Sequence, residues 1–262
     1  IQPQERVLEL SSERKDDKSV EISYTKTTPG SFTIVLDFSE YTNTDKPQDV
    51  HNVNGSSGTL LTLKPKDKDQ HIAYRYSYRY IRGKLNPKFD QKFCYLLPYA
   101  TGTKCEVSEA GFVNEQYFGA KKPDDWKSYY FYTAMEQPVT AARKGTVVEM
   151  VDQFEQSGDV AFTTKKNRLI IEHEDGTLMR YLGFKKGSFK VKPGDEVFPG
   201  TELGQNTLVS KTRYGISLFL YYLKSTDFSG LKGQTLSTPK SLYGIITPAF
   251  LTEDKSCATL EN

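Results

Sequence analysis

The chain has 262 residues, which is enough for one large domain or two domains of ordinary size. Its 35 basic and 33 acidic side chains leave a formal net charge of +2, a balance that argues against a surface built for nucleic acid or for an anionic membrane. No apolar run approaches the roughly 18 residues of a transmembrane helix. Residues 1–5 do not resemble a signal peptide, although a processed chain would look the same.

The aromatic content predicts a β-protein. The 17 Tyr and 15 Phe stand against a single Trp, and aromatic rings favour the half-buried surface of a pleated sheet. After a polar start that ends near Lys18, the first part of the chain alternates apolar and polar residues with a period of two. We therefore predict strands at Val20–Tyr24, Phe32–Phe38, Leu60–Leu63 and Tyr74–Tyr80.

The alternation is cleanest in Tyr74–Tyr80. Its four tyrosines point to one side, while Arg75, Ser77 and Arg79 point to the other. A ladder of rings and arginines that binds single-stranded nucleic acid or sugar is one interpretation. Tyrosines on the core side with arginines in water explain the pattern with fewer assumptions, and we favour that interpretation. Short strands at this spacing predict an immunoglobulin-like β-sandwich over residues 1–105.

The cysteines are Cys94, Cys105 and Cys257, and no Cys-x-x-Cys pair indicates a thiolate metal site. Cys94 and Cys105 flank two apolar edges around a turn, so a disulfide between them would close a hairpin. We expect this bond, with Cys257 free, which favours an oxidising compartment. Three free thiols in a reducing compartment are the alternative.

The second part of the chain, residues 106–262, also follows a strand pattern. It opens with a stretch from Glu106 to Ser128 that indicates a loop, and the polar residues 155–166 indicate another. Val191–Gly200 is a compact turn unit, and no helical period extends beyond three turns. The chain is therefore predicted to be all-β. The strands expected here are Pro138–Ala142, Gly145–Met150, Arg168–His173, Leu178–Leu182, Gly215–Leu223 and Tyr243–Thr247.

Three segments of this half resemble, in their order and spacing, the lysostaphin-type (LytM-like) zinc peptidases. Pro138–Val148 resembles the strand–turn–strand that opens the peptidase domain. Arg168–Leu182 resembles its central hairpin, and Lys185–Gly204 resembles its biotinyl-like half. The resemblance implies a LytM-like β domain with a duplicated hybrid motif over residues 106–262. A β-sandwich precedes this domain in a subgroup of the family, which fits the first half of the chain.

The zinc ligands of that family have no counterparts here. An active member holds zinc with two His and one Asp and leaves a position open for water. The resemblance places Tyr132 at the Asp position and Gly183 at the hairpin His. Ile216 and Leu218 fall on the late His-x-His, and the first His has no equivalent. We expect a degenerate member without metal, cofactor or catalysis. The histidines of the chain are His51, His71 and His173.

The sequence does not support another catalytic arrangement. His173 lies beside Glu174 and Asp175, but one His with adjacent acids lacks convergent zinc ligands, and a turn or packing role is favoured. Ser217 and Cys257 have no base in the sequence pattern, as a serine or cysteine enzyme would require.

The degenerate groove is the predicted ligand-binding site. The family's groove holds an extended peptide, which backbone pairing and aromatic walls can bind without metal. A groove filled by its own aromatic side chains is the alternative. Two arginines beside it are placed to pair with a carboxylate. The residues predicted to form the groove are Tyr132, Gly183, Tyr214, Ile216 and Leu218, with Arg180 and Arg213 beside them.

The resemblance implies an extracytoplasmic protein that acts as a binding or regulatory module of the cell envelope. Its expected partner is a peptidoglycan peptide or a cell-wall hydrolase, since degenerate relatives act on cell-wall enzymes. Two alternatives belong to other classes: an active cell-wall metallopeptidase with atypical ligands, and a structural or carbohydrate-binding β-protein whose first domain carries the activity. Metal content distinguishes the first hypothesis from the active enzyme, and binding by each half alone tests the third.

Overall fold

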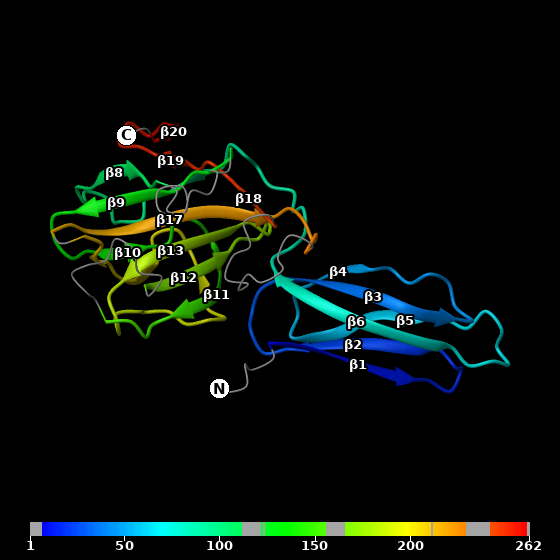
Figure 1. The fold of residues 1–262 in the computed structure, drawn as a ribbon. Helices are drawn as coiled ribbons and strands as arrows, with labels where there is room; N and C mark the ends of the chain where they lie inside the picture. Colours follow the sequence, from blue (N-terminus) through cyan, green and yellow to red (C-terminus); the bar gives the residue numbers. More distant parts are fainter. Residues whose placement is uncertain are drawn as a thin grey trace. The chain divides into compact units, whose positions relative to one another are not determined.

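The computed structural model describes residues 7–111, 122, 124–155, 166–210, 212–228 and 242–260. All regular elements assigned within these ranges are β-strands, which confirms the all-β prediction (Figure 1). No helix in the described ranges has the length and apolarity needed to cross a membrane. The chain divides into two compact units, Ile1–Leu85 and Asn86–Asn262, which are described separately below.

The first unit contains two three-stranded antiparallel sheets (Figure 1). One sheet has the strand order β1-β2-β5 and the other has the order β4-β3-β6. The chain crosses between the sheets after β2, β4 and β5. The strands are β1 (Leu8–Arg14), β2 (Val20–Lys26), β3 (Phe32–Thr42), β4 (Val50–Val53), β5 (Ser57–Leu63) and β6 (Ala73–Arg82).

Side chains from both sheets meet in the core of this unit. Leu8 and Tyr24 of the first sheet share a buried cluster with Phe32 and Ile34 of the second, so the two sheets form a sandwich. The tyrosines of β6 are half-buried against this core, whereas Arg75, Ser77 and Arg79 are exposed. The prediction that the tyrosines face the core and the arginines face water is confirmed.

The second unit is built from a nine-stranded sheet and two small sheets. The large sheet has the order β14-β11-β12-β13-β17-β9-β8, and β16 and β18 also pair with β17. The small sheets are β10-β15 and β20-β19-β7. The strands are β7 (Cys94–Tyr95), β8 (Glu106–Glu109), β9 (Tyr129–Thr133), β10 (Pro138–Thr140), β11 (Gly145–Val151), β12 (Asn167–Glu172), β13 (Leu178–Phe184), β14 (Glu196–Val197), β15 (Glu202–Gln205), β16 (Thr207–Leu208), β17 (Tyr214–Leu223), β18 (Tyr243–Ile245), β19 (Ala249–Leu251) and β20 (Cys257–Thr259).

Strand β17 organises the large sheet. It runs antiparallel to β13 and to β9, so that Ser217 lies in register with Leu182 on one side and Tyr130 on the other. One face of the sheet packs against both small sheets, because the same buried cluster contains Tyr181 of β13, Val139 of β10 and Phe250 of β19. The period of two in β17 thus places alternate side chains in this core.

The boundary between the two compact units lies between Leu85 and Asn86. The sequence had predicted it near residue 105. The segment that follows Asn86 contributes to the core of the second unit: Tyr95 and Tyr99 are buried in it. The hydroxyl of Tyr99 donates to the carbonyl of Phe131, 3.0 Å away. Strand β8, which begins at Glu106, lies within the second unit.

The predicted loops are only partly within the described residues. The stretch from Glu106 to Ser128 begins with strand β8, which pairs with β9, so its first residues are not a loop. Residues 112–121 and 123 of this stretch, and residues 156–165 of the second predicted loop, lie outside the described ranges.

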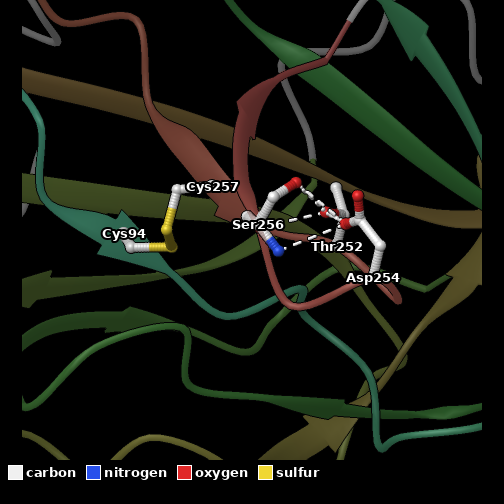
Figure 2. The surroundings of a disulfide bond; sticks show 5 residues. All are labelled: Cys94, Thr252, Asp254, Ser256 and Cys257. Atoms are coloured by element: carbon white, nitrogen blue, oxygen red, sulfur yellow. Dashed lines mark hydrogen bonds between the residues drawn. A yellow bond between two sulfur atoms is a disulfide. The ribbon is translucent and has the colours of Figure 1, made fainter.

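The disulfide joins Cys94 to Cys257, and Cys105 is the free cysteine (Figure 2). The predicted Cys94–Cys105 bond is therefore wrong. The segment after Cys94 does not fold back as a hairpin: the amide of Leu96 donates to the carbonyl of Ala142, which ties the segment to the neighbourhood of β10.

The C-terminal hairpin brings Cys257 to this place instead. β19 pairs in parallel with β7 and antiparallel with β20, in the register Ala249 with Cys94 and Leu251 with Cys257. The turn between β19 and β20 is closed by the side chain of Asp254, which accepts hydrogen bonds from the amide and the hydroxyl of Ser256 (Figure 2). Residues 163 positions apart are thereby covalently linked.

Candidate functional site

The large sheet has two faces, and successive residues of each strand alternate between them. In β17, Ile216 and Leu218 belong to the buried core cluster, so the residues between and beside them point the opposite way. We call this second side the Arg180 face. It carries Tyr130 and Tyr132 of β9, Arg180 of β13, and Gly215, Ser217 and Phe219 of β17.

Two of the predicted groove residues are in the core. Ile216 is 0% and Leu218 is 2% exposed, and both pack with Phe131 and Tyr181 on the side away from Tyr132. The prediction that they line a groove with Tyr132 is wrong, because residues two apart in a strand share a face and Tyr132 is paired with Gly215, not with Ile216. The β17 residues that share a face with Tyr132 are Gly215 and Ser217.

Gly183 is buried beneath Val209 and offers no ligand. Its φ is +118°, and a Cβ at this position would lie 3.2 Å from the carbonyl oxygen of Gly215 and 3.3 Å from a methyl of Val209. A Cβ on Gly215 would lie 2.9 Å from the carbonyl oxygen of Phe131 and 3.3 Å from Val209. Val209 therefore fills the space above both glycines. These two glycines do not fit a zinc ion, because neither has a donor side chain and Val209 adjoins both.

Tyr132 and Arg213 stack on each other. The Arg213 guanidinium carbon is 3.6 Å from the centroid of the Tyr132 ring, and an Arg213 Nη lies 2.7 Å from a carboxylate oxygen of Glu106. The positive charge of Arg213 is thus already paired with a carboxylate. Burial raises the pKa of Tyr132, against the opposing effect of Arg213. Tyr214 is in register with Thr133 and, by alternation, lies on the core side of β17.

Arg180 is the unusual cation of this face. Its guanidinium carbon lies 4.9 Å from the ring centroid of Phe219, and its Nε is buried without a hydrogen-bond partner. Within the described ranges no carboxylate forms an ion pair with it. Burial lowers the pKa of Arg180, and Arg168 acts in the same direction. A buried donor without a partner costs about 1–3 kcal/mol, so an unmatched Arg180 is a local instability.

Lys166 is a second cation beside the same aromatic side chains. Its Nζ is 6.0 Å from the ring centroid of Tyr130, and burial lowers its pKa. Burial also raises the pKa of Tyr130, whose ring stacks on Tyr132 at a centroid distance of 5.4 Å. Arg168, by contrast, is paired with Glu149 at 2.8 Å. Among the described residues, neither Arg180 nor Lys166 forms an ion pair with an acidic side chain, although Glu149 lies near enough to Arg180 to favour its charged form.

His173 is a buried turn residue. Its Nδ1 lies 2.8 Å from the hydroxyl of Thr177, and that hydroxyl donates to the carboxylate of Asp175 at 2.7 Å. His173 Nδ1 must then carry the proton, which leaves Nε2 as a buried acceptor without a partner. Burial lowers the pKa of His173 to about 3. The described part of the chain contains no group of three His, Cys, Asp or Glu side chains that could hold a metal ion.

The predicted and the observed site residues overlap only in part. The structure brings Tyr132, Arg180 and Arg213 to one face but separates Ile216, Leu218 and Tyr214 from them. Sequence reasoning missed Lys166, which fell in a predicted loop, and Val209. Ser217 and Phe219 could have been found, because the apolar residues Ile216, Leu218 and Leu220 already indicate the core-facing phase of the strand.

Neither a family model nor a curated protein matches the chain. Solved structures with partial likeness include the M23 metalloprotease pseudoalterin from the deep sea, at 19% identity and a TM-score of 0.33, over 49% of this chain and 70% of that one. A zinc-containing peptidase from Vibrio cholerae is 13% identical at a TM-score of 0.34, over 82% and 75% of the two chains. Csd3 of Helicobacter pylori is 14% identical at a TM-score of 0.30, over 83% of this chain and 67% of that one. At these TM-scores the likeness does not establish a shared fold.

Proposed function

We propose that this protein is a non-catalytic homologue of the lysostaphin-type peptidases that binds an extended peptide on the Arg180 face. The proposal rests on one observation above all: Tyr132 and Gly183 stand at two of the ligand positions that the resemblance assigns, and Val209 packs on Gly183 and on Gly215, the residue paired with Tyr132. Replacing the glycines would not by itself create a site, because Val209 and backbone oxygens occupy the space that an imidazole needs.

An aromatic and cationic surface supports binding in place of hydrolysis. Tyr130 and Tyr132 are half-buried, whereas the ring of Phe219 is buried, and the Arg180 guanidinium lies against it without an ion-pair partner. Rings and a few polar groups are sufficient to hold an extended peptide without a metal. The ligand in this proposal is a peptide of the peptidoglycan or an exposed segment of a cell-wall hydrolase.

The disulfide supports a location outside the cytoplasm. Cys94 and Cys257 are far apart in the chain, and their bond secures the C-terminal hairpin. Structural disulfides persist in oxidising compartments and are rare where thiol reductants are maintained. We therefore propose that the protein acts in the extracytoplasmic part of a bacterial envelope.

The test is hydrolysis under conditions that favour a zinc enzyme. Tag-free full-length protein is incubated with purified peptidoglycan and with pentaglycine, with added zinc or with a chelator, and the products are followed by mass spectrometry. The proposal predicts no cleavage above the buffer control in either condition, together with retention of the protein on peptidoglycan or on a cell-wall hydrolase. Cleavage that zinc supports and the chelator abolishes would establish an active peptidase with atypical ligands.

A further inference from the structure

We propose that the Arg180 face recognises a carboxylate, with Arg180 pairing directly with it and Lys166 acting as a second cation. This inference rests on the proposed function, since it names the chemical class of the peptide that the face binds. It concerns residues that have no role in zinc binding or hydrolysis.

No described carboxylate forms an ion pair with Arg180, although Glu149 favours its charged form from a distance. The ring contact of Arg180 with Phe219 stabilises the cation in part, but a ring does not satisfy the buried Nε. The neighbouring carboxylate of Glu149 is paired with Arg168 at 2.8 Å. A buried guanidinium without a paired anion raises the free energy of the free protein. A ligand that supplies the anion removes this cost, which favours binding.

Lys166 adds a second charge of the same sign. It lies over the ring of Tyr130, and Tyr130 is close enough to Arg180 for the guanidinium to influence its titration. Burial disfavours the charged form of Lys166, so an incoming anion would stabilise that form. Arg213 has no such need, because Glu106 already lies 2.7 Å from it.

The geometry of the donors selects a carboxylate. A guanidinium presents parallel N–H groups that match the two oxygens of a carboxylate, and such pairs are strongest where aromatic side chains exclude water. The rings of Phe219 and Tyr130 provide that environment here. The carboxylate can come from the C-terminus of a peptide or from an acidic side chain within it.

Nuclear magnetic resonance of the arginine side chains reads out this site in the full-length protein. The Nε–H signal of Arg180 is assigned by its absence from an Arg180→Lys variant. The wild-type protein is then titrated with acetyl-trialanine, with the amide of the same peptide, with acetyl-Ala-Asp-Ala-amide and with inorganic phosphate. We expect a saturable shift of the Arg180 signal with one or both of the acidic peptides, and none with acetyl-trialanine amide.

Lys166→Gln should weaken the binding of the acidic peptide about tenfold, the loss typical of one charge-assisted contact. Lys192→Gln removes the same charge from an exposed position of the same unit and should leave the affinity unchanged. Equal shifts with the acid and the amide, a stronger response to phosphate than to either acid, or no response at millimolar concentration would each overturn the carboxylate assignment. The proposed function is judged separately, by zinc-dependent hydrolysis.

Discussion

At the scale of single residues, the buried imidazole of His173 is held neutral. Its proton lies on Nδ1, directed at Thr177, and Nε2 faces a region without a donor. Burial lowers the pKa of His173 from its ordinary value of 6.5 to about 3. The unfolded chain therefore binds a proton between pH 6.5 and 3 that the folded chain does not bind. The free energy of unfolding is therefore unaffected by the titration of this residue above pH 6.5, and it decreases as the pH falls from 6.5 to 3.

Replacing His173 with Gln should reduce the dependence of stability on pH between 6.5 and 3. Urea unfolding at several pH values, followed by the fluorescence of the single tryptophan, Trp126, reports on the second unit. A His51→Gln variant serves as the control, because His51 is in the first unit, where its Nε2 donates to the carbonyl oxygen of Gln48. If both variants keep the wild-type slope, His173 is not the titrating group.

At the scale of elements, the phase of β17 determines which side chains lie in the core cluster and which lie on the Arg180 face. Leu218 is in register with Tyr181 and Tyr129, and all three are in the core. Ser217 and Phe219, on either side of it, belong to the Arg180 face. A shift of one residue in assigning this strand exchanges the two faces completely.

A Leu218→Asp substitution should therefore destabilise the second unit by more than about 4 kcal/mol, because it buries an unpaired carboxylate in the core. The free energy of unfolding is measured by urea titration with Trp126 fluorescence. Met135→Asp introduces the same charge at a position that is 62% exposed and should change stability by less than about 0.5 kcal/mol. Equal effects of the two substitutions would show that Leu218 does not face the core.

The sequence predicted strands well and the site less well, for physical reasons. Alternation in β6 and β17 is a local property, so their existence and type could be predicted. The position of Val209 above Gly183 depends on the pairing of β16 with β17, which no local pattern encodes. Matching Ile216 and Leu218 to the His-x-His motif overlooked that apolar residues at alternate positions already fix the core side.

At the scale of the whole molecule, the disulfide connects the end of the chain to the beginning of the second unit. Cys94 lies in β7 and Cys257 in β20, and both strands border β19. A bond that closes a loop of this length restricts the unfolded chain strongly, by about 5 kcal/mol in the chain-entropy model. Sequence reasoning paired Cys94 with the nearer Cys105, because the β7–β19–β20 sheet joins distant segments and no local sequence pattern indicates it.

Thiol counting on unfolded, non-reduced protein should find one reactive cysteine, and peptide mapping should identify it as Cys105. Cys257→Ser should lower the free energy of unfolding of the second unit by about 2–5 kcal/mol, whereas Cys105→Ser removes no cross-link. A labelled Cys257 in the unfolded wild-type protein would contradict the bond.

The absence of a usable metal site is the central claim, and calorimetric titration of the tag-free, chelator-treated full-length protein with zinc tests it most directly. A His51→Gln, His71→Gln double variant measures any binding by the histidines of the first unit. Because Gly183 and Gly215 lie under Val209, we predict that the double variant shows no saturable zinc binding. One zinc bound per chain with submicromolar affinity in the double variant would contradict the account.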